Sequence, residues 1–562
     1  MIESPTKPQH HKDTKTLIDA LLAEQQSLTA VDRSSRWHES VNPAAHGISY
    51  QHLIPLTKPD KGEQYGFEVD LDRCSGCKAC VTACHSLNGL DEDEAWRETG
   101  LLLGEDWRQP YQQTVTTACH HCVDPGCLNG CPVLAYEKDP VTGIVRHLDD
   151  QCIGCQYCIL KCPYEVPKYS VKRGIVRKCD MCSQRLAVGE APACAQACPN
   201  EAIRISIVNQ EDQATQFRGD RKRRASSDAL RTIPTPLFLP VSPLPSITVP
   251  TTRYVSGRPF PQAITSADAG TTKPQPAHVP LIAMLVLTQM SVGISLMFPL
   301  MHNRLGSPVI MAAMSSVLLL AGLVASVFHL GRPLKAWRAF LGLKTSWLSR
   351  EIVAFSGLVP LALSTLVLTC FHTPWASALR VPVACLTAGI GVLSVACSSM
   401  IYQDTKRVSW KGWRTFSKFF GTTALLGTGC AWVLGTLEGR AEWFLGAMLA
   451  TFQLLKFAAE HLANLPMERD GEPTSEMNKV GSPAWQLERS ERLMTGRLGG
   501  WSRSRMALGW LGGVALPLFC LVNPAASPIT SLAALTLIVA GECVERSLFF
   551  RTVTTFKMPG NL

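Results

Sequence analysis

The sequence predicts two unlike halves, an α+β domain followed by an all-α polytopic membrane domain of eight transmembrane helices. Two observations support this prediction. Sixteen of the 22 cysteines lie between Cys74 and Cys198, and from Val279 onward long apolar segments alternate with short polar ones. The mean hydropathy of +0.09 averages these halves, and 562 residues suffice for more than one domain. The composition excludes a simple soluble enzyme, a disordered protein and a small disulfide-stapled secreted domain.

Composition divides the chain into five segments. Residues 1–65 form a polar N-terminal extension without an apolar run long enough for a signal peptide, so we expect no export signal in this chain. Residues 66–205 form the cysteine-rich domain. Residues 206–278 form a basic, Pro-rich linker with the run Arg221–Arg224 and ten prolines, which favour extended chain. The membrane domain covers residues 279–550, and residues 551–562 form a C-terminal tail.

Eight apolar segments are long enough, or nearly so, to cross a hydrocarbon core of roughly 30 Å as helices. They cover Val279–Met301, Val309–Leu330, Ile352–Phe371, Val381–Tyr402, Phe419–Leu437, Trp443–Leu462, Met506–Val522 and Ile529–Val544. An even number of spans places both ends of the membrane domain on one side of the membrane, together with loops 331–350, 403–418 and 463–505.

The positive charge is concentrated on that same side. Loops 331–350 and 403–418 are rich in lysine and arginine, whereas the opposite loops carry little beyond Arg304, Arg380 and Arg440. The positive-inside rule therefore predicts the cysteine-rich domain on the cytoplasmic side of the cytoplasmic membrane. A basic surface that docks an acidic partner is the alternative. The net charge of +9 thus indicates orientation, and we expect no nucleic-acid partner.

The sixteen clustered cysteines form four groups with similar spacing. The groups are Cys74-x2-Cys77-x2-Cys80-x3-Cys84, Cys119-x2-Cys122-x4-Cys127-x3-Cys131, Cys152-x2-Cys155-x2-Cys158-x3-Cys162 and Cys179-x2-Cys182-x11-Cys194-x3-Cys198. Thiolates at x2 spacing surround an iron–sulfur cube, and the fourth cysteine of a group binds the other cube of a pair. Disulfides would not explain four near-identical spacings, and zinc sites do not continue a CxxC pair in this way. The pattern predicts a ferredoxin-like domain that binds four [4Fe–4S] clusters.

Spacing leaves the pairing of the groups open, and a resemblance suggests one. Stretches such as Cys152-Ile-Gly-Cys-Gln-Tyr-Cys and Lys178-Cys-Asp-Met-Cys resemble the four-cluster iron–sulfur subunits of the dimethyl sulfoxide reductase family of molybdoenzyme complexes. In that family the first group interleaves with the fourth and the second with the third. The resemblance implies four ligand sets: Cys74, Cys77, Cys80 and Cys198; Cys84, Cys179, Cys182 and Cys194; Cys119, Cys122, Cys127 and Cys162; and Cys131, Cys152, Cys155 and Cys158.

Two motifs in the membrane half resemble the anchor subunit of the same family, so the chain resembles a fusion of both subunits. His329-Leu330-Gly331-Arg332-Pro333 ends the second span, and Ser346-Trp347-Leu348-Ser349-Arg350-Glu351-Ile352 opens the third. The resemblance implicates His329 and Glu351 in menaquinol binding and oxidation, while Arg332 would orient the headgroup or neutralise a carboxylate. Quinol oxidation releases protons, which requires groups that titrate near neutrality. The alternative for His329 is a boundary histidine bonded to a nearby carbonyl.

Further ionisable residues lie in later spans. Lys456, Glu460 and His461 share one face of the sixth span, with Lys456 and Glu460 as i, i+4 partners. They and Glu542 suit either a proton route or charge pairs that serve packing. We expect no haem, because a haem with two histidine ligands needs paired histidines inside the bilayer, and His302 and His372 lie in loops.

The leading hypothesis is a membrane-bound electron-transfer subunit without catalytic residues of its own. The resemblance implies that it oxidises menaquinol and passes electrons through the clusters to a molybdopterin-containing catalytic subunit, which reduces a small substrate such as dimethyl sulfoxide in anaerobic respiration. Two alternatives remain. The stretch Cys84–Asp91 resembles iron–sulfur subunits of cytoplasm-facing sulfite-oxidising complexes, which deliver electrons to quinone. In the other alternative, the membrane half is only a structural anchor.

Overall fold

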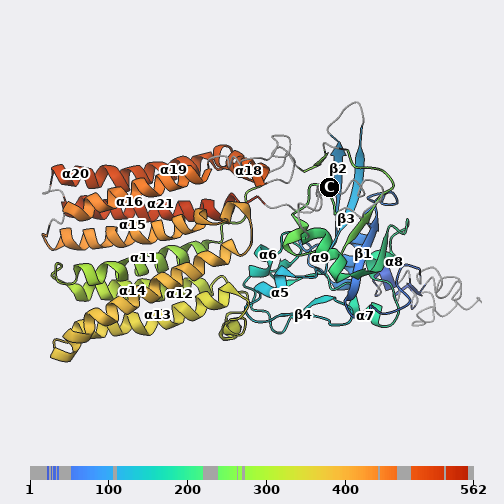
Figure 1. Cartoon of the computed structure of the whole chain (residues 1–562), viewed down its shortest axis with the longest axis horizontal. Coiled ribbons are helices and arrows are strands. Elements are labelled where there is room, and N and C mark those ends of the chain that lie inside the picture. The colour runs from blue at the N-terminus through green and yellow to red at the C-terminus, as the bar shows by residue number, and fades with distance from the viewer. Residues whose placement is uncertain are drawn as a thin grey trace, which may run out of the picture.

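The computed structural model describes residues 52–104, 110–218, 238–261, 264–268, 273–440, 443–464, 483–523 and 527–554, with residues 20, 22–23, 27, 29–32 and 35–36 near the N-terminus. Figure 1 shows two bodies arranged end to end along the long axis, a helical bundle and a domain that contains all the strands. Most of the predicted N-terminal extension, the run Arg221–Arg224 and the last eight residues of the predicted tail lie outside the described residues.

The α+β domain contains two three-stranded sheets. In the first, the central β1 (Glu63–Asp70) pairs antiparallel with β8 (Ile203–Asn209) and parallel with β9 (Arg253–Val255). In the second, the central β2 (Glu98–Gly104) pairs antiparallel with β3 (Gln112–Thr117) and with β10 (Ile264–Ser266). Alternation explains β8, in which Ile203 and Ile205 are buried while the intervening Arg204 is half-buried.

Two β-hairpins and six short helices complete this domain. The hairpins are β4 (Tyr136–Lys138) with β5 (Val145–His147), and β6 (Lys168–Ser170) with β7 (Ile175–Arg177). The helices are α4 (Ala79–Asn88), α5 (Gly126–Gly130), α6 (Tyr157–Lys161), α7 (Ser183–Ala187), α8 (Ala193–Gln196) and α9 (Gln210–Arg218). Cluster cysteines lie on four of these helices: Cys80 and Cys84 on α4, Cys127 on α5, Cys158 on α6 and Cys194 on α8.

The stretch predicted as a linker contributes to the α+β domain. Both β9 and β10 come from residues 206–278, and each pairs with the central strand of a different sheet. The two strands fall in proline-free intervals, between Pro250 and Pro259 and between Pro261 and Pro274. Proline cannot donate to a strand ladder, so these intervals are where pairing is available.

The bundle contains ten helical segments among the described residues. They are α11 (Val279–Met301), α12 (Pro308–Val327), α13 (Trp347–Cys370), α14 (Pro374–Gln403), α15 (Trp413–Leu437), α16 (Trp443–Asn464), α18 (Pro483–Thr495), α19 (Gly499–Trp510), α20 (Leu516–Val522) and α21 (Ser527–Arg551). A π-helical turn, η5 (Leu511–Ala515), joins α19 and α20 into one continuous segment. The short turns η3 (Pro333–Phe340) and η4 (Val408–Trp410) lie in the loops at the domain end.

Seven helices in the described part of the chain are long and apolar enough to cross a membrane. The prediction of eight spans is therefore not confirmed. The sixth predicted span corresponds to α16, whose 22 residues include Gln453, Lys456 and Glu460 and which is not among the seven. The segment Gly499–Val522 is longer than the predicted Met506–Val522.

Close contact between α11 and α15 forms the centre of the bundle. Most of the surface of both helices is buried, unlike that of α12 and α13. A Cβ atom on Gly293 would collide with the backbone of Thr423 and Gly427 on α15. Small residues let helix backbones approach closely in apolar surroundings, so this glycine contact fixes the central crossing.

Candidate metal centres and the membrane-facing site

Each of the four cysteine groups has a loop with left-handed backbone at a residue other than glycine. These residues are Lys78, His121, Gln156 and Met181, with positive φ values of 63°, 40°, 59° and 60°. Each lies between two cysteines at x2 spacing. Such conformations are unfavourable by about 1–3 kcal/mol each and accumulate at functional sites, where the surroundings enforce them. The left-handed backbone in these four loops therefore marks them as candidate functional sites.

The second and third groups enclose a cavity of about 380 Å³. It is lined by Cys119, Cys122, Cys127 and Cys162. Burial raises the pKa of Cys127 to about 12, and the thiolates of Cys162 and Cys119 contribute to this rise. The structure therefore brings together the four cysteines that the resemblance assigned to one ligand set.

A second cavity, of about 270 Å³, adjoins the bundle. Its lining includes Cys131, Cys152, Cys155 and Cys158, again one of the predicted sets. Burial raises the pKa of Cys131 to about 11, and the Cys152 thiolate contributes. We call these residues the inner cysteine set, because they lie nearest the membrane half.

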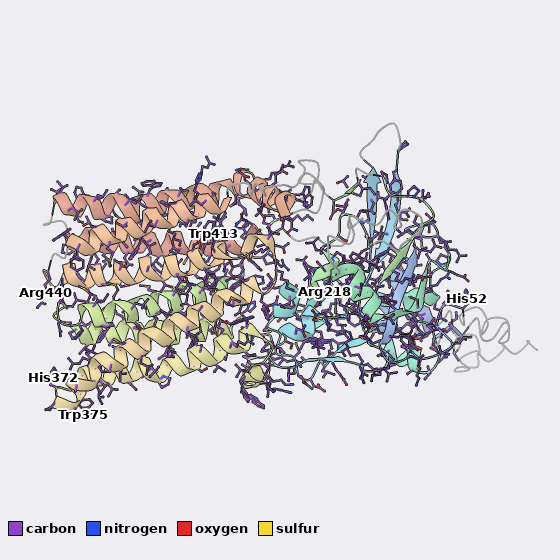
Figure 2. The ribbon with its side chains drawn as sticks, in the orientation of Figure 1. His52, Arg218, His372, Trp375, Trp413 and Arg440 are labelled. Carbon is purple, nitrogen blue, oxygen red and sulfur yellow. The ribbon has the colours of Figure 1, made fainter. Side chains whose placement is uncertain are left out.

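The remaining eight cysteines lie toward the outer part of the domain. Burial raises the pKa of Cys182 to about 12, with a contribution from the thiolate of Cys194, and Cys84 is close to both. Cys80 is close to Cys198, whereas Cys77 is exposed and Cys74 half-buried. His52, which pairs with Glu201 just after Cys198, marks the end of the domain farthest from the bundle (Figure 2).

Backbone amides donate to the cysteine sulfurs. The N–H groups of Ala135, Gly154, Met181 and Ala202 lie 3.2–3.4 Å from the sulfurs of Cys131, Cys152, Cys179 and Cys198 respectively. Such donors stabilise negative charge on a cluster ligand and raise the reduction potential of the cluster.

Two buried cations lie between the cysteine sets. The Nζ of Lys178 lies 3.6 Å from Cys119 Sγ. Arg97 is 1% exposed, and its pKa, which burial would lower, is raised by the thiolates of Cys194 and Cys80. These cations would offset part of the negative charge of thiolate-bound clusters.

The donor set fits iron–sulfur cubes. All 22 cysteines are described, and none is bonded to another. Within the described residues, no three cysteine, histidine or acidic side chains converge closely enough to bind a single ion. A cube instead binds each thiolate at a different iron, and the two cavities are each lined by four cysteines.

The membrane motifs dock directly on the inner cysteine set. Leu330 and Ile352 pack in the same hydrophobic cluster as Cys131, Cys152 and Cys158. The N–H of Arg332 donates to Ile153 O at 3.0 Å. A Cβ atom on Gly331 would collide with the carbonyl oxygen of Gly174, so only glycine allows this approach. The ends of α12 and α13 are therefore held against the loop that carries Cys152 and Cys155.

His329 lies at this junction. Its ring packs edge-on against that of His278, with centroids 5.3 Å apart, and it hydrogen-bonds to the backbone of Cys155. Burial, together with the neighbouring His278, lowers the pKa of His329 to about 4. The imidazole is therefore neutral near pH 7.

Glu351 is buried near the N-terminal end of α13. Its side chain is 4% exposed, and it forms no ion pair with any described residue. Ser398 of α14 is its polar neighbour. A buried carboxylate without a cation, at a helix end that meets the cysteine-rich domain, is a candidate functional residue.

Arg332 binds backbone carbonyl groups of the cysteine-rich domain. Its guanidinium donates to the carbonyl oxygens of Asp149, at 2.8 Å, and Arg173, at 3.3 Å, rather than to a carboxylate. Lys335 donates to Asp150 O at 2.6 Å. The basic residues of loop 331–350 therefore include groups that fasten the two halves together.

Loop 403–418 fastens the same junction from the other side. Lys161 pairs with Asp404 at 2.7 Å, and the hydroxyl of Tyr157 donates to Ile401 O at 3.1 Å. Arg407 donates to the carbonyl oxygens of Ile159 and Leu160. Sequence reasoning assigned no role to Tyr157, although its place inside the Cys155–Cys158 loop is a signal that could have found it.

A separate polar network lies in the second half of the bundle. Lys456 pairs with Glu542, and Arg505 bridges Glu460 at 2.8 Å and Glu542 at 3.6 Å. The expected i, i+4 partnership of Lys456 and Glu460 is not formed, because both side chains reach charged groups on neighbouring helices. Sequence reasoning missed Arg505, Glu545 and Arg546. The last two form an ion pair at 2.6 Å, and their charge within an apolar span is the signal that could have found them.

Comparison with known proteins gives two family matches. Residues 111–207 match the 4Fe-4S dicluster domain, and residues 276–551 match the DMSO reductase anchor subunit.

The curated relatives correspond to about a quarter of the chain. A probable anaerobic dimethyl sulfoxide reductase chain of Escherichia coli (strain K12) is 37% identical over 155 residues, 26% of this chain and 75% of the relative. A subunit of the anaerobic dimethyl sulfoxide reductase of Haemophilus influenzae is 35% identical over 157 residues, 26% of this chain and 76% of the relative. The iron–sulfur subunit of the nitrate-inducible formate dehydrogenase of E. coli (strain K12) is 34% identical over 169 residues, 26% of this chain and 57% of the relative.

Proposed function

This chain belongs to the dimethyl sulfoxide reductase family and joins an iron–sulfur part and a membrane anchor part in one polypeptide, and on that premise we propose that it transfers electrons between membrane menaquinol and a molybdopterin-containing catalytic subunit. One observation carries the proposal. Leu330 and Ile352, the neighbours of His329 and Glu351, pack in one hydrophobic cluster with the inner cysteine set. The proposed quinol site and the nearest metal centre are therefore in contact through packed side chains.

We assign four [4Fe–4S] clusters to the domain, one to each of the four ligand sets. The lining of the two cavities by two complete sets supports this assignment. The proximity of Cys84, Cys182 and Cys194 supports a third set, and that of Cys80 and Cys198 supports the fourth. When bound, the clusters supply one-electron transfer.

The sets form a row from the membrane to the outer surface. The inner cysteine set adjoins the bundle, and the set with Cys119 follows it. Cys179 is close to Cys119, which supports the set with Cys84 as the next in the row. The set with Cys198 is outermost, and its exposed Cys77 marks the face where the catalytic subunit docks. That subunit reduces a small substrate such as dimethyl sulfoxide, as the names of the relatives suggest.

His329 and Glu351 are the proposed proton acceptors for quinol oxidation. The neutral imidazole of His329 has a lone pair available, and Glu351 has no competing cation among the described residues. Arg332 acts at a distance, because its bonds to Asp149 and Arg173 hold the segment that carries His329.

We propose that α16 is an eighth membrane crossing, in addition to the seven apolar helices. Its charged side chains are paired inside the bundle, which lowers the cost of placing them in an apolar layer. It packs against α15 and α20 as a member of the bundle.

We place the cysteine-rich domain on the cytoplasmic side. The basic loops support this placement, although Arg332, Lys335 and Arg407 also bind the domain itself. His372, Trp375 and Arg440 lie at the opposite end of the bundle (Figure 2), so reporter fusions in those loops test the orientation. Alkaline phosphatase activity there is expected, and fluorescence of a cytoplasmic reporter would contradict it.

The function is tested by the reduction of the clusters by a menaquinol analogue in the purified complex, followed by electron paramagnetic resonance (EPR). Wild type is expected to show reduced clusters, whereas His329→Gln and Glu351→Gln are expected to lose quinol-driven reduction and retain reduction by dithionite. Thr365→Val, a polar-to-apolar change deep in α13, is the control. Unchanged quinol-driven reduction in both variants would support a membrane half that is only an anchor.

A further inference from the structure

A large cavity with both polar and apolar walls lies between α15, α16, α18, α19 and α21, and its volume, open solvent included, is about 1220 Å³. Its lining includes Ser409 and Trp410 of η4, in the same loop as Arg407, which binds the cysteine-rich domain. The cavity therefore lies at the domain end of the bundle. It is remote in the chain from His329 and Glu351, neither of which lines it.

Among the buried and half-buried groups in and beside this cavity, positive charge exceeds negative charge. The charged network consists of five cations and three carboxylates: Arg414, Lys418, Lys456, Arg505 and Arg546, and Glu460, Glu542 and Glu545. All three carboxylates are in ion pairs with these cations. Glu491 also lines the cavity and is exposed to solvent. A surplus of two positive charges remains among the buried and half-buried groups.

Two arginines on the lining have donors without partners. Arg414 is 7% exposed, and its guanidinium forms no hydrogen bond or ion pair with the residues that the structure describes. Arg505 is 3% exposed, and its Nε and Nη1 atoms have no hydrogen-bond acceptor in that part of the chain. Burying the charged donors of Arg505 without acceptors is unfavourable, and the guanidinium of Arg414 remains accessible from the cavity. These arginines therefore indicate a missing anionic ligand.

The rest of the lining indicates what kind of anion. Phe457, Met506, Leu548 and Phe549 form apolar walls beside the charged groups. A guanidinium matches two oxygens of a phosphate, and apolar walls suit an acyl chain. We propose that the cavity binds an anionic phospholipid, with its phosphate on Arg414 and Arg505.

This proposal does not depend on the redox function. It predicts that the lipid braces the loop of Ser409 and Trp410, because Arg407 in the same loop holds Ile159 and Leu160 of the cysteine-rich domain. Basic pockets between transmembrane helices are known to hold phospholipid headgroups.

The test uses the purified, detergent-solubilised full chain in its complex. Lipid that remains bound after mild extraction is identified by native mass spectrometry. After delipidation, the complex is titrated with phosphatidylglycerol, phosphatidylcholine or inorganic phosphate, and the shift in melting temperature is measured. Wild type is expected to retain about one anionic phospholipid per chain and to be stabilised by phosphatidylglycerol only.

Arg414→Gln is expected to bind phosphatidylglycerol about tenfold more weakly, the loss expected for a charge-assisted hydrogen bond. The matched control is Arg503→Gln, an exposed arginine on α19 two residues from Arg505, which is expected to bind as wild type does. Equal binding by Arg414→Gln and wild type would overturn the proposal. So would wild type without bound anionic lipid, stabilisation by phosphatidylcholine to the same degree, or stabilisation by inorganic phosphate alone. The measurements on wild type decide the matter even if Arg414→Gln does not fold.

Discussion

The two halves of the helical bundle contain buried charge in opposite arrangements. In the half formed by α12, α13 and α14, the carboxylate of Glu351 is 4% exposed and pairs with no described cation. In the half formed by α15, α16, α19 and α21, Glu542 is 1% exposed and contacts both Lys456 and Arg505. Both carboxylates lie in apolar helices, so their surroundings and not their depth distinguish them.

This difference separates a structural role from a chemical one. A buried carboxylate that is matched by cations holds helices together, and removing it leaves those cations unpaired. A buried carboxylate without a cation contributes little to folding and remains free to take up a proton. We therefore assign a role in proton transfer to the half of the bundle with His329 and Glu351. To the half with Glu542 we assign the structural role of holding the helices together.

The largest expected effect comes from removing Glu542, the carboxylate that is paired with cations. Glu542→Leu leaves Lys456 and Arg505 buried without their carboxylate, and we expect it to destabilise the bundle by about 3–5 kcal/mol. Thermal or denaturant unfolding of the purified complex measures the effect. The double variant with Lys456→Met is expected to recover much of the loss, and no recovery would contradict the pairing.

Changing Glu351, the carboxylate without a described cation partner, is expected to have a smaller effect on stability and a larger effect on activity. Glu351→Gln removes a buried charge without leaving a partner, so its unfolding free energy should change by less than about 1 kcal/mol. Quinol-dependent turnover should fall at least about tenfold, which corresponds to ~1.4 kcal/mol of barrier. Loss of stability similar to that of Glu542→Leu would remove the distinction between the halves.

The junction between the cysteine-rich domain and the bundle offers a test with an intermediate expected effect on stability. Gly331→Ala places a methyl group against Gly174 O, and we expect about 1–3 kcal/mol of destabilisation by overpacking. Faster hydrogen exchange at the amide of Arg332, which donates to Ile153 O, would report the opened junction. Gly357→Ala on α13, where a Cβ has open space, is the control and should leave exchange unchanged.

The smallest expected effect concerns the ion pair between Lys161 and Asp404, whose side chains are 10% and 25% exposed. Asp404→Asn should weaken the junction by about 1 kcal/mol, because the amide keeps one hydrogen bond but loses the charge. Limited proteolysis between the cysteine-rich domain and the bundle measures the change. A loss as large as that of Gly331→Ala would show that charge, rather than close backbone packing, dominates the junction.

The cysteine sites could be predicted from sequence because their chemistry is local. An x2 spacing brings thiols together within one loop, as in Cys152–Cys155 and Cys119–Cys122. The pairing of groups could not be derived in the same way, because Cys127 and Cys162 meet only through the fold. The docking of Arg332 was likewise hidden, since its acceptors are backbone carbonyls that no side-chain pattern reveals.

The prediction of the helices from sequence has a similar limit. Apolar length predicted seven spans correctly as elements, but α16 lies near the boundary because Lys456 and Glu460 lower its hydropathy. Their partners, Glu542 and Arg505, are on other helices, and helix packing rather than i, i+4 spacing decides the pairs. The strands β9 and β10 escaped prediction because the surrounding prolines dominate the composition of residues 206–278.

The central claim is that the quinol site adjoins the inner cysteine set. The most direct test is the EPR spectrum of the reduced complex with and without a non-reactive quinol analogue. Binding of the analogue is expected to change the signal of one cluster only, the signal that Cys155→Ser removes, and His329→Gln should abolish the change. If the analogue changed the signal that Cys77→Ser removes, or changed none, the proposed contact between quinol site and inner cluster would be contradicted.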